Sequence, residues 1–451
     1  MTFLNAPVRF DQARPLAQAV ARAAAATGVD VLLVRDLLGR FSLLLDDRTG
    51  GGVDPARADA WQEQLVTSLG RYAAERPLLL ASGLFQPDAL LASPRAVDEF
   101  GYVPGPGQGR ISWLDNTVVG EDWAKVSTPE PESDGVRTSR TALYGFKGGV
   151  GRSTATFMLA KHLADQDHCV LVVDLDLESP GSGPLLVAED QLPEYGIVDQ
   201  LVESALGNEE GLDLVAPATH VPVKGNGELW VAPARGRGAE DIEYAYVDKL
   251  NRVYADVPAH GLSGFADRLE AAVRACEDAV AQQSRRPDVV LIDSRAGIHD
   301  IAAVAISRLC DLALLFGSDN GQTWAGYRDL FTAWRSSGQA PAIREKLRMV
   351  ASMVPDSPDR PQAEYLESFR DHAWSCFSVL YDDLAADDAS GFNPSPEDDS
   401  APHAPIPILF TLELVGLDAA STPGWEGTSF VQTAYASFLE TATHLMIEGP
   451  R

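Results

Sequence analysis

The chain has 451 residues, of which 45% are hydrophobic and 22% are charged, as in a soluble globular protein of two or three domains. Its formal net charge of −29 argues against nonspecific binding to nucleic acid or anionic lipid. The four cysteines are widely scattered, which favours buried free thiols over a zinc site. The chain begins with no signal-peptide pattern and contains no apolar run near the roughly 18 residues of a membrane helix. We therefore expect a cytoplasmic protein that does not bind membranes.

The first part of the chain, residues 1–126, predicts a small α+β module. Residues 14–28 have the pattern of an Ala-rich helix ended by glycine, and residues 29–47 read as a strand-turn-strand hairpin. A helix over 55–75 and a strand over 77–81 follow. No polar residues converge in this pattern, so we expect a module without an active site that contacts a partner protein.

Two segments are poor in apolar periodicity. Residues 127–139 are rich in Pro, Ser and Glu and predict a linker between the first module and a second domain, residues 140–451. Residues 382–405 are acidic and rich in turn-forming residues, which predicts a mobile surface loop inside the second domain.

The second domain opens with the pattern of a phosphate-binding loop. Residues 141–146 predict a strand, residues 147–154 (KGGVGRST) a glycine-rich turn, and residues 155–166 an amphipathic helix. Glycines allow several backbone N–H groups to point at one anion, and the helix N-terminus adds partial positive charge. One position departs from the usual pattern, because Arg152 stands where such loops carry lysine.

Aspartates end two further apolar runs. Residues 168–183 place Asp174 and Asp176 on one side of a strand end, and residues 286–300 contain a strand that ends at Asp293. Carboxylates at the carboxyl ends of parallel strands lie where doubly wound sheets bind ligands, although such aspartates also serve as turn or helix caps. Together with the loop, the three elements predict a nucleotide site.

The remaining elements complete a doubly wound, mostly parallel α/β sheet. Apolar strands are expected within residues 311–320, 346–357 and 405–416, with a helix between the first two. The last helix, residues 427–449, contains no lysine or arginine. It therefore lacks the basic face of a membrane-binding helix and is expected to pack on the core, with an apolar stripe at Phe430, Ala434, Phe438 and Leu445.

These motifs resemble those of a known family. Residues 147–154, 172–181 (VVDLDLESPG) and 291–297 (LIDSRAG) are similar to the deviant Walker A loop, the adjacent acidic motif and the Walker-B-like motif of MinD/ParA-type ATPases. These ATPases belong to the dimerising SIMIBI class of P-loop NTPases. The resemblance covers residues 140–450 and leaves 1–130 unexplained.

The resemblance implies ATP and Mg²⁺ as cofactors and gives each matching residue a role. Lys147 would reach the phosphates of a partner subunit, and Asp176 would position the attacking water, so these two form the implied catalytic pair. The implied nucleotide-binding residues are Lys147, Gly148, Gly149, Val150, Gly151, Arg152, Ser153 and Thr154. The implied magnesium residues are Ser153, Asp174 and Asp293.

Two departures from the family pattern bear on activity. Arg152 keeps the positive charge of the usual lysine but has a planar, bulkier head, which favours binding over well-aligned hydrolysis. Arg295, in the Walker-B-like turn, is either a substitute phosphate contact or a surface residue, and we favour the surface role.

Three functions fit the pattern. The first is an ATP-binding, slowly hydrolysing switch that forms a homodimer and regulates a protein partner through residues 1–126. The alternative is a pseudo-ATPase scaffold that binds nucleotide without turnover. A phosphotransferase related to bacterial tyrosine kinases ranks last, because the chain has no terminal tyrosine cluster.

Overall fold

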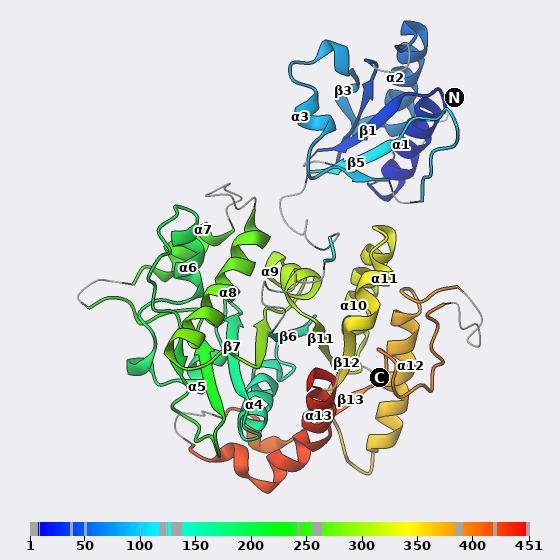
Figure 1. Cartoon of the computed structure of the whole chain (residues 1–451). Coiled ribbons are helices and arrows are strands. Elements are labelled where there is room, and N and C mark those ends of the chain that lie inside the picture. Colours follow the sequence, from blue (N-terminus) through cyan, green and yellow to red (C-terminus); the bar gives the residue numbers. More distant parts are fainter. Residues whose placement is uncertain are drawn as a thin grey trace. The chain divides into compact units, whose positions relative to one another are not determined.

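The computed structural model describes residues 8, 10–36, 39–48, 52–99, 101–116, 123, 125–127, 138–240, 244–254, 264–383, 391–417 and 422–447. The chain divides into two compact units, Met1–Val119 and Gly120–Arg451. Figure 1 shows the elements of each unit, coloured from blue at the N-terminus to red at the C-terminus. Each unit has its own sheet and its own core.

The first unit is a five-stranded sheet with helices. Its strands lie in the order β3-β2-β1-β5-β4. The elements are α1 (Phe10–Ala25), β1 (Asp30–Arg35), β2 (Phe41–Asp46), α2 (Pro55–Leu69), β3 (Ala73–Leu80), α3 (Asp88–Leu91), β4 (Val97–Asp98) and β5 (Ile111–Asp115). Strands β1 and β2 pair antiparallel, so the predicted hairpin is confirmed. Strand β1 also pairs parallel with β5, which makes it central in the sheet.

The core of this unit follows from the alternation of side chains along β1 and β2. Leu33 and Leu43 face the cluster that contains the buried stripes of α1 and α2, whereas Leu32 and Leu44 face a smaller cluster on the other side of the sheet. Helix α2 starts where the sequence indicates, because the Asp54 carboxylate accepts a hydrogen bond from the backbone N–H two residues later.

The second unit contains an eight-stranded sheet with the order β13-β12-β11-β6-β10-β7-β9-β8. The strands are β6 (Ser139–Gly145), β7 (Cys169–Leu175), β8 (Ala216–Pro217), β9 (Glu228–Ala232), β10 (Val289–Ser294), β11 (Leu312–Gly317), β12 (Leu347–Val354) and β13 (Ile406–Leu409). Only β8 pairs antiparallel among the described strands of this sheet. The predicted doubly wound, mostly parallel sheet is therefore confirmed.

Helices cover both faces of this sheet. They are α4 (Arg152–Ala164), α5 (Ser182–Leu186), α6 (Ile197–Ser204), α7 (Tyr246–Val253), α8 (Phe265–Gln283), α9 (Asp300–Val304), α10 (Gly321–Ser336), α11 (Ala340–Ile343), α12 (Gln362–Phe377) and α13 (Ser429–Ile447). One face packs against α6, α8, α10 and α12, and the other against α4 and α13, which lie side by side (Figure 1). Consecutive residues of β6 alternate between the two cores, as a strand buried on both faces requires.

Helix α13 packs on the core as predicted, with Ala434 and Phe438 buried. Phe430, which the predicted stripe includes, is instead 66% exposed. The buried stripe begins one residue later, at Val431, because that position faces the sheet. Within the described residues, no helix combines the length and apolar character that a bilayer span requires.

The start of the second unit lies earlier than the predicted end of the first module. The Trp123 ring packs against the rings of Tyr144 and Trp334, with centroids 6.2 and 5.8 Å away. The backbone N–H of Ser127 donates to the carbonyl of Ser307 at 2.9 Å. Burial of a tryptophan thus extends the second unit upstream of its first strand. Residues 128–137 of the predicted linker lie outside the described residues.

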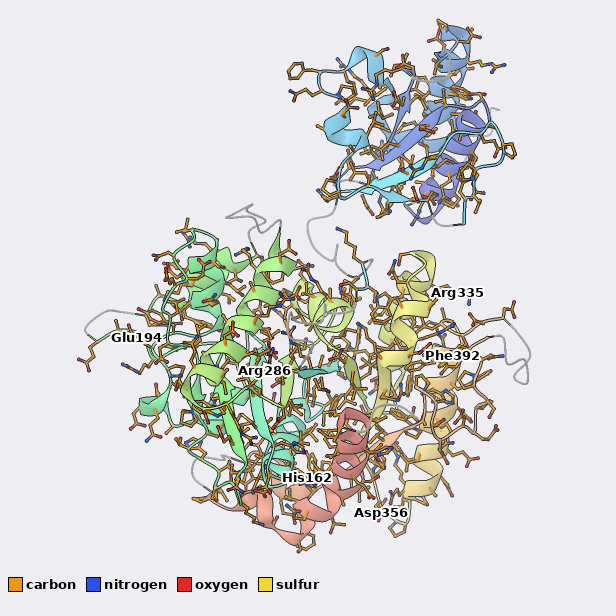
Figure 2. The ribbon with its side chains drawn as sticks, viewed as in Figure 1. His162, Glu194, Arg286, Arg335, Asp356 and Phe392 are labelled. Carbon is orange, nitrogen blue, oxygen red and sulfur yellow. The ribbon has the colours of Figure 1, made fainter. Side chains whose placement is uncertain are left out.

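The predicted acidic loop, 382–405, is described in part, since residues 384–390 lie outside the described residues. Asp382 pairs with Arg344 at 2.7 Å. Phe392, labelled in Figure 2, packs against the Tyr381 ring with centroids 5.7 Å apart. His403 is fully buried and its Nδ1 lies 2.7 Å from the Tyr381 hydroxyl. The described part is therefore packed against the second unit, and mobility of the segment stays a prediction.

Candidate nucleotide-binding site

The glycine-rich loop joins β6 to α4 at the carboxyl edge of the sheet. Gly149 and Gly151 have φ of 75° and 76°, a left-handed conformation that favours glycine. Val150 between them is buried and anchors the loop to the core. Helix α4 begins at Arg152 without a side-chain cap, and the first N–H groups of a helix have no intrahelical acceptor. The loop therefore has the backbone of an anion-binding site.

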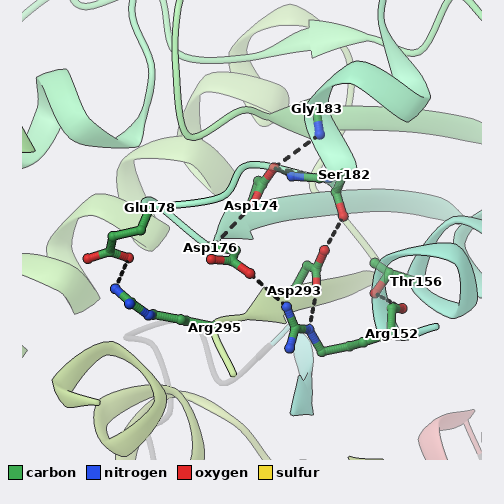
Figure 3. A network of polar contacts seen from close by, with 10 residues as sticks. Arg152, Thr156, Asp174, Asp176, Glu178, Ser182, Gly183, Asp293 and Arg295 are labelled. Atoms are coloured by element: carbon green, nitrogen blue, oxygen red, sulfur yellow. Dashed lines mark hydrogen bonds and ion pairs between the residues drawn. The ribbon is translucent and has the colours of Figure 1, made fainter. Parts of the chain in front are cut away.

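Arg152 does not extend away from the protein but turns into the sheet edge. Its guanidinium donates from Nε to Asp293 Oδ1 and from Nη2 to Asp176 Oδ2, both at 2.8 Å (Figure 3). The residue is 7% exposed. Its third nitrogen, Nη1, is buried and has no hydrogen-bond partner among the described residues. One arginine thus joins the two predicted acidic motifs and keeps one unused donor.

Asp293 is the penultimate residue of β10 and is fully buried. Its Oδ1 accepts from Arg152, and its Oδ2 accepts from the Ser182 hydroxyl at 2.5 Å. Ser182 is the first residue of α5, so this bond ties the start of that helix to the neighbouring strand end (Figure 3). Both carboxylate oxygens of Asp293 are therefore engaged by protein donors.

Asp174 lies opposite Asp293 in the parallel pairing of β7 and β10. Its Oδ2 accepts from the backbone N–H groups of residues 181–183 at 3.0 to 3.1 Å, and its Oδ1 accepts from the N–H of Asp176 at 3.1 Å. Burial raises the pKa of Asp174 to about 7, and the nearby Asp293 charge adds to the rise. This is the capping role that the sequence leaves open as the alternative.

The predicted magnesium residues do not assemble a metal site in this arrangement. The carboxylate oxygens of Asp174 and Asp293 already accept hydrogen bonds from protein donors. The Ser153 hydroxyl lies against Gly181, where an added Cβ would approach it to 2.8 Å. No cluster of three or more His, Cys, Asp or Glu among the described residues is arranged to hold a metal. The residues present therefore fit a phosphate group, through the backbone of the loop and the start of α4, but do not fit Mg²⁺.

The remaining predicted loop residues lie around the same anion-binding backbone. Lys147 is exposed and has no hydrogen bond or ion pair within the described part of the chain. Gly148 has open space around it, since an added Cβ would meet nothing within 4 Å. Ser153 and Thr154, in the first turn of α4, are half-buried. The structure thus brings Arg152, Asp176 and Asp293 together, whereas Lys147 stands apart from them.

A second ion pair, not anticipated from the sequence, joins the two acidic loops. Arg295 Nη1 lies 2.5 Å from Glu178 Oε2 (Figure 3). The Tyr254 hydroxyl donates to the same carboxylate. Arg295 is thereby engaged by protein. Burial raises the pKa of Asp176, and the charge of Arg152 opposes that rise.

This geometry defines a class of protein. The first strand of the parallel sheet leads through a glycine loop into a helix, and aspartates lie at the carboxyl ends of two neighbouring strands. This arrangement is a P-loop NTPase fold. Residues 141–383 match the family model described as "CobQ/CobB/MinD/ParA nucleotide binding domain". The chain belongs to this family, as the resemblance of its motifs implies.

Three solved structures are similar to part of this chain. MinD of Pyrococcus furiosus, a cell division ATPase, matches with 17% identity and a TM-score of 0.43, covering 68% of this chain and 100% of that one. The MinC:MinD complex of Aquifex aeolicus matches with 18% identity, a TM-score of 0.39 and 68% and 96% coverage. ParA of pNOB8, bound to nonspecific DNA, matches with 14% identity, a TM-score of 0.42 and 70% and 100% coverage. No curated protein gives a significant sequence match.

Proposed function

We propose that the second unit binds ATP in the glycine loop and works as a nucleotide-dependent dimerisation switch with slow hydrolysis, which regulates a partner protein. The observation that carries this proposal is the buried, unpartnered Nη1 of Arg152 beside an uncapped helix N-terminus. A buried donor without an acceptor costs free energy, on the order of 1–3 kcal/mol, and a phosphate oxygen would satisfy it. Membership of a nucleotide-binding family supports the same ligand.

Binding draws mainly on groups that need no lysine at position 152. Backbone N–H groups of the loop, the partial charge of the helix N-terminus and the guanidinium of Arg152 all attract phosphate. The side chain of Arg152 is already fixed by two aspartates, so little of its conformational entropy remains to be lost on binding.

Turnover is expected to be slow because Asp176 is already in use. The family resemblance assigns this carboxylate to the attacking water, yet its Oδ2 accepts from Arg152 at 2.8 Å. A carboxylate neutralised by a guanidinium is a weaker hydrogen-bond acceptor for water and is held in one direction. A misplacement of about 1 Å in a reacting group costs on the order of 10²-fold in rate.

Dimerisation is proposed from the position of Lys147. Its side chain is exposed at the start of the loop, ahead of the glycines, and is free within the described residues to reach another subunit. The first unit is proposed to contact a protein partner, since it has its own core and sheet. The net charge of −29 makes nucleic acid an unfavourable partner.

The second candidate function is a pseudo-ATPase scaffold, which binds nucleotide without turnover. The same contact between Arg152 and Asp176 favours it, provided that bound nucleotide leaves the ion pair closed. In that case Asp176 stays paired with Arg152 and is held away from an attacking water, and the nucleotide is a structural ligand.

Calorimetric titration of ATP and ADP, with phosphate release measured on the same sample, tests both candidates. Binding of ATP with slow release supports the switch, and binding without release supports the scaffold. Asp176→Ala should bind ATP and lose any release, whereas Lys147→Ala should bind ATP as a monomer. Absence of binding for both nucleotides would contradict both candidates.

A further inference from the structure

We infer that Arg152 takes the place of a divalent cation in this site, so that the chain binds nucleotide independently of Mg²⁺. The inference rests on the proposed nucleotide binding and specifies which protein group contacts the phosphates in place of a metal ion. It follows from the three nitrogens of one guanidinium: two are bonded to carboxylates and the third is buried and unused.

Asp176 and Asp293 are already paired with a cation, the guanidinium of Arg152. A magnesium ion in such a site would bridge anionic phosphate and protein oxygens. Here the guanidinium already compensates Asp176 and Asp293 at 2.8 Å, in a position where only 7% of the arginine is exposed. A divalent ion that used these carboxylates would have to open a buried ion pair, and breaking such a pair is unfavourable.

The carboxylate oxygens of Asp174 and Asp293 are not free to coordinate Mg²⁺. Magnesium requires near-octahedral oxygen coordination at about 2.1 Å. Both oxygens of Asp293 accept from Arg152 or Ser182, and those of Asp174 accept from four backbone N–H groups. These bonds also hold the start of α5 in place, so freeing either carboxylate would disturb the fold around the loop.

The guanidinium of Arg152 is held in one orientation by its two aspartate partners. A guanidinium is planar and presents its donors in a fixed fork, which suits carboxylates and phosphates together. With Nε and Nη2 held by the two aspartates, the direction of Nη1 is fixed as well, and a phosphate oxygen is the acceptor proposed for it. A lysine ammonium is a compact point charge without this fork, so it cannot reproduce all three contacts. Arg152→Lys should therefore restore a need for Mg²⁺.

The test is a calorimetric titration of the whole chain with ATP, once with Mg²⁺ and once with a chelator. For the wild type we expect the two dissociation constants to differ by less than about threefold. For Arg152→Lys we expect ATP to bind at least about tenfold more weakly in chelator than in Mg²⁺. Arg295→Lys is the matched control, since it changes an arginine of the neighbouring loop that does not contact Asp176 or Asp293, and it should respond like the wild type.

The wild-type comparison decides the inference even if Arg152→Lys fails to fold. A loss of wild-type affinity of about tenfold or more in chelator would overturn it while leaving the proposed nucleotide binding intact. Absence of ATP binding in both solutions would instead overturn the proposed function, and this inference with it. A similar response of Arg152→Lys and Arg295→Lys to the chelator would also contradict the role given to Arg152.

Discussion

Removing the guanidinium of Arg152 should destabilise the carboxyl edge of the second sheet. In Arg152→Met, Asp293 and Asp176 keep their charges at 0% and 9% exposure but lose the group that compensates them. Breaking a buried ion pair by removing one partner costs about 3–5 kcal/mol. Arg295→Met is the control, because its pair with Glu178 is 30% and 24% exposed, and pairs near the surface are worth about 1 kcal/mol or less.

Hydrogen exchange measures this loss locally, without assuming that a chain of two units unfolds in one step. Peptides that span β7 and β10 should lose protection by about 10²-fold or more in Arg152→Met, since each 1.4 kcal/mol is roughly tenfold. Arg295→Met should lose less than about tenfold. Equal losses in both variants, or none in Arg152→Met, would refute the view that Arg152 compensates buried charge.

The pH dependence of Arg152→Met has a definite sign. Burial already raises the folded-state pKa of Asp176, and without the guanidinium it should rise further, because the opposing charge of Arg152 is gone. The folded variant therefore takes up protons that the unfolded chain does not, and its stability increases as the pH falls. The difference in protection between variant and wild type should shrink as the pH is lowered from neutral.

Two further predictions concern other contacts of the site, and a third concerns the first unit. Because the pKa of Asp174 is raised from 3.8 to about 7, the wild type should gain stability as the pH falls through this range. Asp174→Asn should lack that gain in thermal melts. Equal changes of melting temperature with pH in the two proteins would contradict this. Gly181→Ala places a methyl group 2.8 Å from Ser153 Oγ and should weaken ATP binding about tenfold. Gly321→Ala is the control, because an added Cβ there meets no atom within 4 Å, and it should leave ATP binding unchanged in calorimetry. Removal of 1–119 should leave ATP affinity within about threefold, and loss of binding in a folded truncation would be evidence against it.

Much of the fold could be predicted because local signals and burial agree. Strands β7 and β10 begin with continuous apolar runs and β6 has a shorter one, which is the pattern of parallel strands covered on both faces. Each ends in the glycine loop or at an aspartate, and parallel strands bring those ends to one edge. The loop, Asp176 and Asp293 were therefore expected together from spacing alone.

Strands β8 and β9 were not anticipated. Residues 228–232 form β9, a short strand that pairs with β7. Strand β8 has only two residues, which is too short a pattern to be recognised in the sequence. Trp123 was likewise assigned to the wrong side of the predicted boundary, because its burial depends on Tyr144 and Trp334, the second of which is far along the chain.

The direction of Arg152 could not be read from the sequence. A residue in a phosphate loop is expected to face the ligand, and its partners, Asp176 and Asp293, are 24 and 141 positions away. Only the packing of β7 beside β10 places both carboxylates within reach of one guanidinium. Ser182 was missed for a similar reason, although the small residues after Asp176 signal a close approach of backbone to the site.

The central claim, a switch in which nucleotide assembles two chains, is tested most directly by sedimentation of the whole protein with and without ATP. We predict one chain per particle without nucleotide or with ADP, and two chains per particle with ATP. Lys147→Ala should stay at one chain with ATP while a parallel titration still detects binding. An ATP-bound wild type that sediments as a single chain, or a Lys147→Ala variant that dimerises like the wild type, would contradict the account.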